Sequence, residues 1–395
     1  MPRQARSAGP LLADRTLVVD NGAYTIKAGF ASPCPDPEKD CHVIPNCMAR
    51  SRNKRVYVGA QLESCKDFGE MMFRRPMEKG YLVNWEAEKE IWDHSFFNKD
   101  AKLKCDPHET NLILTEAPNA LPALSTNTDQ IVFEEYEFSA YYRCLGPPLN
   151  AYNDIGALYG DAARDSSAPI QPAECILLVD SGYSHTTITP VYQGRAVQRA
   201  IRRLDIGGKL LTNYLKELVS VRHYNMMDET HLMNEVKEAA SFVSADFKAD
   251  LERTWKGNSR GPKSDIVVDY VLPDYNTHAQ GFMRAHDASA GAKLKKVGAA
   301  AGEGSEDLMT LGNERFAVPE LLFSPTDIGM RQAGLAESIM QSLSALPSGL
   351  WPAMLANIVV VGGNARIQGF RERLEMELRP LAPTECVIRI ASPPE

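Results

Sequence analysis

The sequence has no pair of cysteines with the spacing of a zinc site or a redox motif, although it contains eight cysteines. It has no apolar run long enough to span a membrane, and no hydrophobic segment of the secretory type precedes the cysteines. We therefore expect free thiols, a reducing compartment and no membrane association. Cys41, His42 and Cys47 are too irregularly spaced for a zinc knuckle, so we expect them to pack in the core.

Positive charge is in the minority, because 43 Lys and Arg residues face 51 Asp and Glu residues, for a net charge of −8. Such a surface disfavours nucleic-acid binding over its whole extent and leaves only local basic clusters, at residues 50–55 and 293–296. The length of 395 residues is enough for two domains with separate cores. Residues 1–14 have the composition of a disordered tail, and the Gly, Ala and Ser content of residues 288–307 predicts a flexible insertion.

One pattern occurs twice in the chain. It begins with an apolar run that ends in an Asp, a small polar residue and a Gly, and a second strand-like run follows. The pattern covers residues 16–30 and again residues 175–192. The pattern predicts a strand, a tight turn and a returning strand. The Gly lets backbone amides point at an anion, and Asp20 and Asp180 are placed to hold a hydrated metal ion. Either hairpin alone is an ordinary turn, but the pair predicts a clasp for a polyphosphate.

Apolar residues at helical or strand spacing predict the main elements. Helices are expected over residues 85–97, 131–142, 207–220 and 227–247. Strands are expected over residues 56–58, 111–116 and 266–274. A further buried strand in IVVVGGNARIQGF ends at Gly362 and Gly363 and leads into a helix, a place where backbone can approach a planar or anionic ligand closely.

Together these motifs resemble the actin superfamily over nearly the whole chain. VVDNGAYTIKAGF and VDSGYSHTTITPVY resemble its two phosphate loops, and VVVGGNARIQGF resembles its adenosine motif. Within the superfamily, VIPNC, GYLVNW, MDETH and NERFAVPE resemble a nuclear class of actin-related proteins. The resemblance implies the α/β fold shared by actin, sugar kinases and heat-shock chaperones, with two domains and four subdomains around a central cleft.

The resemblance also implies where the domains lie. The first would span residues 15–172 with a small subdomain at about 41–71, and the second residues 173–395 with a small subdomain at about 207–308. In actin, further helices follow the point that ASPPE resembles, so we expect the C-terminal part of the first domain to be missing and apolar surface to be exposed there.

The site residues are implied by the same resemblance. Asp20 and Asp180 match the carboxylates that hold hydrated Mg²⁺, and Lys27 matches the phosphate-binding lysine. The other positions that match nucleotide contacts are Asn21, Gly22, Ser181, Gly182, Gly208, Lys237, Glu238, Gly362, Gly363 and Asn364. The implied ligand is ATP or ADP with Mg²⁺, and the alternative is a chain without a cofactor. Tyr24 and Tyr183 depart from the family pattern. A Tyr at a turn position that requires a positive φ would destabilise the fold by on the order of 1 kcal/mol.

The functional implications follow from further departures. Gly146 and Thr187 stand where actin has the Gln and His that position the attacking water, so we expect ATP hydrolysis to be lost and no catalytic residue to remain. His185 is a poorly aimed substitute. The short basic turn at residues 51–55 replaces the long loop that actin filaments need, so no self-polymerisation is expected.

The resemblance to the nuclear class implies a non-catalytic structural subunit of a chromatin-remodelling complex that exchanges a core histone for its Z variant and so affects transcription. Its partners would be the other subunits, with histone or nucleosomal contact left open, and it would lie in the nucleus and also in the cytoplasm. The alternative is a nucleotide-hydrolysing actin-like protein with a cytoskeletal role.

Overall fold

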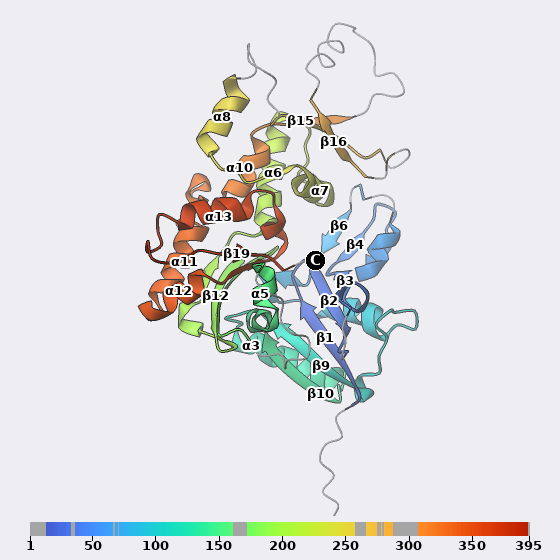
Figure 1. Cartoon of the computed structure of the whole chain (residues 1–395). Helices are drawn as coiled ribbons and strands as arrows, with labels where there is room; N and C mark the ends of the chain where they lie inside the picture. The colour runs from blue at the N-terminus through green and yellow to red at the C-terminus, as the bar shows by residue number, and fades with distance from the viewer. Residues whose placement is uncertain are drawn as a thin grey trace, which may run out of the picture. The chain divides into compact units, whose positions relative to one another are not determined.

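The computed structural model describes residues 13–32, 36–65, 68–69, 71–160, 172–256, 266–274, 278, 280–286 and 307–393 (Figure 1). The chain forms two compact units, one from Met1–Cys65 and Met71–Leu149 and the other from Lys66–Glu70 and Asn150–Glu395. The domain limits expected at residues 172 and 173 stay a prediction. Nearly all of the expected tail and insertion lies outside the described residues, but Ala13 is placed and its carbonyl oxygen accepts a hydrogen bond from Asn111 Nδ2 at 2.7 Å.

The first unit is built on a five-stranded sheet in the order β10-β9-β1-β2-β3. Its strands are β1 Arg15–Asn21, β2 Thr25–Phe30, β3 His42–Pro45, β9 Thr110–Glu116 and β10 Ala140–Leu145. β1 and β2 form an antiparallel hairpin, while β9 runs parallel to both β1 and β10. Alternate residues of β1, such as Leu17 and Val19, are fully buried, because one face of the sheet packs against the α2 region with its large side chains Trp92 and Phe96.

Shorter elements complete this unit. Its helices are α1 Pro37–Asp40, α2 Trp85–Trp92 continued by a π-helical turn Asp93–Phe97, α3 Pro122–Gln130, and α4 Gly146–Leu149. Its other strands are β4 Met48–Arg50, β5 Val56–Val58 and β6 Met72–Arg74, which form the small sheet β5-β4-β6, and the pair β7 Met77–Glu78 and β8 Tyr81–Leu82.

The helix expected over residues 131–142 is wrong. Only Ile131–Glu135 is helical, as a π-helical turn that continues α3. Glu137 has a φ of +57°, a left-handed conformation that ends the helix, and the chain then enters β10 beside β9. The helix expected over residues 85–97 and the strand expected over residues 56–58 are confirmed.

The second unit contains the larger core and a six-stranded sheet. The sheet runs in the order β13-β12-β11-β18-β19, with β14 paired to β12. Its strands are β11 Cys175–Ser181, β12 Thr186–Tyr192, β13 Arg195–Ala196, β14 Arg202–Leu204, β18 Ile358–Val361 and β19 Ile390–Ala391. Every residue of β11 except Asp180 is buried, as expected for a central strand covered on both faces.

Some helices of this unit pack on the six-stranded sheet, and others lie near a second small sheet, β16-β15-β17 (Figure 1). The helices are α5 Ile155–Leu158, α6 Gly208–Arg222, α7 Thr230–Ala240, α8 Phe247–Lys256, α10 Glu314–Glu320, α11 Leu335–Ser344, α12 Trp351–Leu355 and α13 Phe370–Leu378. The small sheet comprises β15 Val268–Val271, β16 Phe282–Ala285 and β17 Leu308–Leu311. None of the described helices is long and apolar enough to cross a membrane.

The single helix expected over residues 227–247 is wrong, because the structure has two helices, α7 and α8, with an irregular segment between them. In this segment Phe242 forms an isolated β-bridge with Gln368, and its amide donates to the Arg315 carbonyl oxygen at 3.0 Å. These tertiary hydrogen bonds replace the ones a continuous helix would make.

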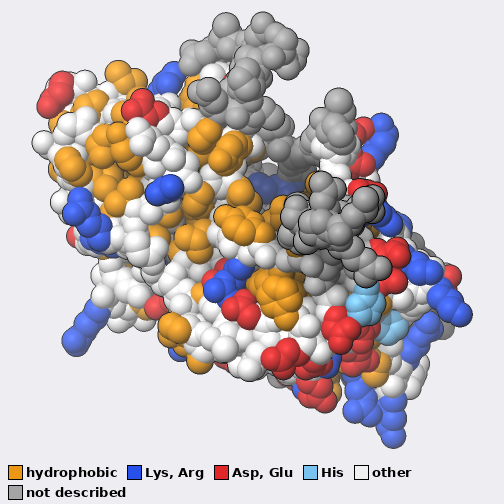
Figure 2. Space-filling view, turned by 90° about the horizontal axis from the view of Figure 1, so that it is seen from below, with side chains coloured by type: hydrophobic (Ala, Val, Ile, Leu, Met, Phe, Trp, Pro, Cys, Tyr) orange, Lys and Arg blue, Asp and Glu red, His pale blue; other side chains and the backbone are white. Residues whose placement is uncertain are grey.

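The surface shows hydrophobic side chains in several separate patches among polar and charged ones (Figure 2). The more exposed ones include Met72, Tyr142 and Phe133 in the first unit and Val221, Met376 and Leu381 in the second.

Candidate nucleotide site

The first hairpin places Asp20 at the end of β1, directly opposite Lys27 on β2. The Asp20 carboxylate accepts a hydrogen bond from Thr115 Oγ1 at 2.6 Å and forms an ion pair with Lys27 Nζ at 3.5 Å. About half of each charged side chain is exposed, so both can also reach a ligand. Thr115, on β9, orients the carboxylate and was not among the residues expected from sequence.

Gly22 occupies the tight position of this turn. A Cβ atom there would lie 2.5 Å from the Thr25 carbonyl oxygen, so only glycine fits without a backbone shift. The steric role expected for this glycine is confirmed. Its amide, however, donates to the Asp20 carbonyl oxygen at 3.1 Å within the turn itself, in contrast to the expectation that it points at an anion.

Tyr24 does not adopt the positive φ expected for it, and neither does Tyr183 in the second hairpin, so that expectation is wrong for both. The Tyr24 carbonyl oxygen accepts from the Asn46 amide at 2.8 Å and from Arg75 Nη1 at 3.2 Å. The Arg75 guanidinium also lies 4.4 Å from the centre of the Tyr24 ring. The turn is thus held by two residues distant in sequence rather than by a strained backbone.

A polar cluster beside the hairpin comprises the half-buried Asn21 at the end of β1 and the fully buried Asn46, Glu88 and Trp92. Trp92 Nε1 donates to Glu88 Oε1 at 2.9 Å, and Asn46 Nδ2 donates to the Gly22 carbonyl oxygen at 2.9 Å. Three buried acceptor atoms, Glu88 Oε2 and the Oδ1 atoms of both asparagines, have no hydrogen-bond donor among the described residues. Burial raises the pKa of Glu88 to about 7, although the side chains of Asn21, Trp92 and Asn46 favour the ionised form.

The second hairpin places Asp180 opposite Thr187. Ser181 is fully buried, and its hydroxyl lies 2.8 Å from that of Thr186. Asn364, also buried, donates from Nδ2 to the Gly182 carbonyl oxygen at 2.8 Å and to Ser181 Oγ at 3.2 Å. Ser181 and Asn364 therefore hold the hairpin to the loop after β18, with their side chains directed into the protein.

Gly182 does not need to be glycine in this structure. A Cβ atom there would come no closer than 3.7 Å to its neighbours, and its φ is not positive, so the steric role expected for this residue is wrong. The Gly182 amide donates to the His185 carbonyl oxygen at 3.1 Å, and the Gly208 amide donates to the Gly182 carbonyl oxygen at 3.0 Å. The start of α6 is thus bonded to the hairpin, and these two amides donate within the protein instead of toward an anion.

Lys237 lies buried beside the start of α6. Its Nζ donates to Asn234 Oδ1 at 2.8 Å, Thr212 Oγ1 at 3.1 Å and the Gly208 carbonyl oxygen at 3.4 Å. Burial lowers the pKa of Lys237 to about 8, with the charge of Glu238 opposing the shift. Glu238 itself is exposed and accepts from Asn234 Nδ2 at 2.8 Å.

The glycine pair after β18 forms an open shelf beside Asp180. Gly362 has a φ of +91°, and a Cβ atom there would lie 2.4 Å from the Ser181 carbonyl oxygen and 2.9 Å from Asp180 Oδ1. Gly363 is exposed, and a Cβ atom on it would meet nothing within 4 Å. A shelf without side chains next to a carboxylate fits a nucleotide with Mg²⁺, since a planar ring or a hydrated ion can approach the backbone closely.

Two positions, Gly146 and Thr187, match by the resemblance the residues of actin that position the attacking water. Thr187 is buried in β12, and Gly146 has no side chain. His185, in the turn, has a buried Nδ1 without a hydrogen-bond partner in the described part of the chain. Burial and the neighbouring Arg203 lower its pKa to about 4, so the ring is neutral at physiological pH.

Comparison with known proteins agrees with the fold and the motifs. The family model described as actin matches residues 12–395. The actin-like protein arp6 of Aspergillus fumigatus is 57% identical over 97% of this chain and 86% of its own length. Actin-related protein 6 of Neurospora crassa is 54% identical over 99% of this chain and 87% of its own length. Actin-related protein 6 of Drosophila melanogaster is 36% identical over 97% of this chain and 90% of its own length. These relatives are named actin-related protein 6 or actin-like protein arp6, the class that the sequence motifs resemble, and the expected resemblance and fold class are confirmed. The chain belongs to the actin family.

Proposed function

We propose that this chain is a non-catalytic structural subunit of a nuclear chromatin-remodelling complex that exchanges a core histone for its Z variant. The absence of catalysis is supported mainly by Gly146 and Thr187. They stand where other members of the family have the side chains that orient the attacking water. The high identity to relatives named actin-related protein 6 supports the choice of this class over a filament-forming or ATP-hydrolysing member.

In this proposal a nucleotide, ATP or ADP with Mg²⁺, is a structural ligand that is not turned over. The candidate contacts are Asp20 and Lys27 in the first unit, and Asp180 with the shelf at Gly362 and Gly363 in the second. The Mg²⁺ ion would neutralise phosphate charge. A ligand that binds only the folded chain would raise its stability, so the nucleotide would act on folding rather than on chemistry.

The partners are the other subunits of the complex, and the chain does not polymerise with itself. The short β4–β5 turn at residues 51–55 supports this, because it is too short to reach into a neighbouring molecule. Nucleus is the proposed main location, with a cytoplasmic pool.

Two measurements test the proposal together. Purification of the tagged chain from nuclear extract should recover remodelling subunits, and deletion of its gene should reduce the chromatin-bound Z variant. Unchanged Z-variant occupancy, together with a purified chain that releases phosphate from ATP at actin-like rates, would favour the cytoskeletal alternative and reject the proposal.

A further inference from the structure

The second unit has a groove between α11 and α13 that belongs neither to the nucleotide site nor to either hairpin. Its volume is about 360 Å³. Phe323, Gly334 and Ala336 form part of its lining together with Met376, Pro380 and Leu381. The first three are buried or half-buried, whereas 55% of Met376 and 49% of Leu381 are exposed. The groove therefore has a deep apolar part and an exposed apolar rim.

The groove is also acidic. Of the described residues that line it, two carry a carboxylate, Glu337 on α11 and Glu377 on α13, and none is basic. Glu337 is exposed, and its Oε1 lies 3.5 Å from the amide nitrogen of Gln341. The chain as a whole has a net charge of −8, so the long-range field also favours a cationic partner.

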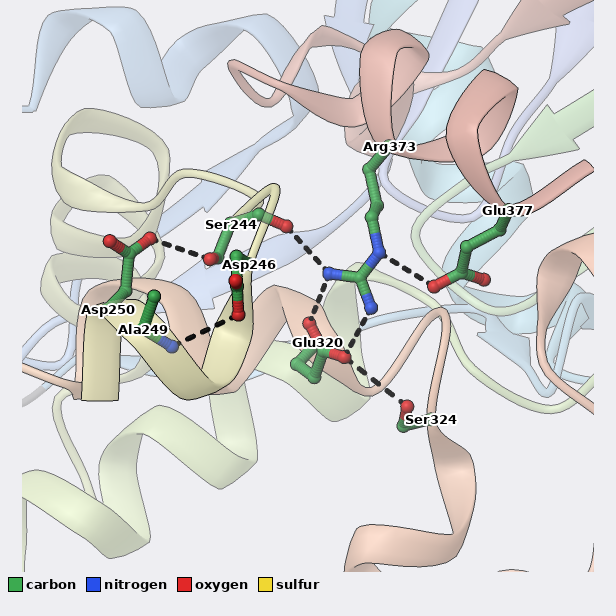
Figure 3. A network of polar contacts seen from close by, with 8 residues as sticks. All are labelled: Ser244, Asp246, Ala249, Asp250, Glu320, Ser324, Arg373 and Glu377. Carbon is green, nitrogen blue, oxygen red and sulfur yellow. Dashed lines mark hydrogen bonds and ion pairs between the residues drawn. The ribbon is translucent and has the colours of Figure 1, made fainter. Parts of the chain in front are cut away.

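Glu377 is held in place by a buried ion-pair network (Figure 3). Arg373, one turn earlier on α13, donates from Nε to Glu377 Oε1 at 2.7 Å. Its Nη2 and Nη1 atoms donate two parallel hydrogen bonds to the Glu320 carboxylate, at 2.7 and 3.0 Å. Nη1 also donates to the Ser244 carbonyl oxygen at 2.6 Å. Because Glu320 already balances the charge of Arg373, Glu377 adds a fixed negative charge to the groove wall.

The same network fixes the apolar part. The Arg373 guanidinium lies 5.1 Å from the centre of the Phe323 ring, which in turn packs against Phe370 with ring centres 5.8 Å apart. The backbone below is closely packed, since a Cβ atom on Gly334 would lie 1.8 Å from the Phe323 carbonyl oxygen. A groove whose lining is fixed in this way needs little ordering when a partner binds, which favours affinity.

We propose that this groove docks a basic amphipathic helix of a partner protein, with one or two apolar side chains seated on Phe323 and Ala336 and a Lys or Arg against Glu337 and Glu377. The volume lies at the low end of ligand pockets, which run from about 300 to 1,000 Å³, and suits side-chain anchors. The exposed rim at Met376 and Leu381 extends beyond the cavity, so a helix covers it better than a small molecule does. The inference rests on the proposed function as a partner-binding subunit and names the chemistry of one partner.

The test uses the full chain and a fluorescein-labelled synthetic helix of about 15 residues that has leucines on one face and lysines on the other. Fluorescence anisotropy at about 150 mM salt should show saturable binding. Glu337→Lys and Leu381→Ser should each weaken it about tenfold, because the first reverses a charge that faces the lysines and the second removes apolar contact area at the rim. Glu375→Lys makes the same charge change at an exposed position of α13 outside the groove lining, and it should leave affinity within about twofold.

Four results would overturn the proposal. If Glu337→Lys and Glu375→Lys weaken binding equally, the probe is attracted by the overall charge of the surface and not by the groove. If a probe with serines in place of leucines binds equally well, the apolar part of the groove makes no contribution to binding. Absence of binding would exclude a basic helix, and a dimer of the chain that Leu381→Ser dissociates would make a second copy the occupant. Thermal melts of each variant establish that it is folded. If the probe result holds while the tagged chain recovers no remodelling subunits, the proposed function fails and the docking groove stands.

Discussion

Replacing Glu88 by Gln should stabilise the protein at neutral and alkaline pH but not at acidic pH. Glu88 is fully buried at the start of α2, and burial raises its pKa from an ordinary value near 4.5 to about 7. A carboxyl whose pKa is raised by folding contributes stability below its unfolded pKa, and this contribution is lost as the pH rises through the folded pKa. The window therefore runs from about pH 4.5 to about pH 7.

The magnitude follows from the shift. A difference of about 2.5 pKa units, at about 1.4 kcal/mol per unit, gives an expected loss on the order of 3 kcal/mol across the window. Gln cannot ionise, its carbonyl oxygen can accept from Trp92 Nε1, and its amide can donate to the Asn21 or Asn46 Oδ1 atoms that lack a donor among the described residues. The advantage of Glu88→Gln should thus grow from about zero near pH 5 to a few kcal/mol at pH 8.

Urea unfolding at several pH values measures this difference, with Trp fluorescence as the probe because Trp85 and Trp92 lie in the same unit as Glu88. The control is Glu90→Gln, the same change at an exposed position of α2, which should give a curve parallel to that of the wild type. If Glu88→Gln also runs parallel to the wild type between pH 5 and 8, or loses stability as the pH rises, the account of a buried neutral carboxyl is refuted.

Three further outcomes are expected. Gly362→Ala should destabilise the protein by at least about 1 kcal/mol in thermal melts, because alanine is strained at φ +91° and its Cβ would clash with the Ser181 carbonyl oxygen. Gly363→Ala, at an open position, should change the stability very little in the same melts. Lys237→Met should lower the free energy of unfolding in urea by about 1–3 kcal/mol, since it leaves buried acceptors without their donor; an unchanged midpoint would show that these hydrogen bonds contribute nothing. Mg·ATP should raise the melting temperature without phosphate release above a protein-free blank, and actin-like release would contradict the expected loss of hydrolysis.

The sequence was sufficient for the features that depend on local pattern. Asp20 and Asp180 end buried strands as expected, since an apolar run followed by Asp and Gly signals a strand end without knowledge of the rest of the fold. The expected helix over residues 131–142 failed because its apolar spacing continued past the helical turn that ends at Glu135 and into the first residues of the edge strand β10. Periodicity cannot distinguish these cases, and the pairing partner β9 lies more than 20 residues away.

The geometry of the hairpins depended on residues that no local pattern connects to them. Thr115 is 95 residues from Asp20 in the chain, and Arg75 is 51 residues from Tyr24. Their hydrogen bonds let Tyr24 keep an ordinary backbone, so the strain expected from the turn sequence is absent there. A tertiary donor at a turn carbonyl can replace the conformational freedom of glycine, and the turn sequence alone carries no sign of it.

Two groups of nucleotide-motif residues differ in what they do in the folded chain. Ser181, Lys237 and Asn364 are buried, and each makes hydrogen bonds that join the second hairpin, α6, α7 and the loop after β18. We expect these residues to stabilise the packing whether or not a nucleotide is bound, because their removal would leave buried polar groups without partners. Asp20 and Lys27 are about half exposed, and their side chains remain accessible to a ligand. The presence of the buried group is therefore consistent with a structural subunit, whereas Asp20 and Lys27, like Asp180 and the shelf at Gly362 and Gly363, bear on nucleotide binding.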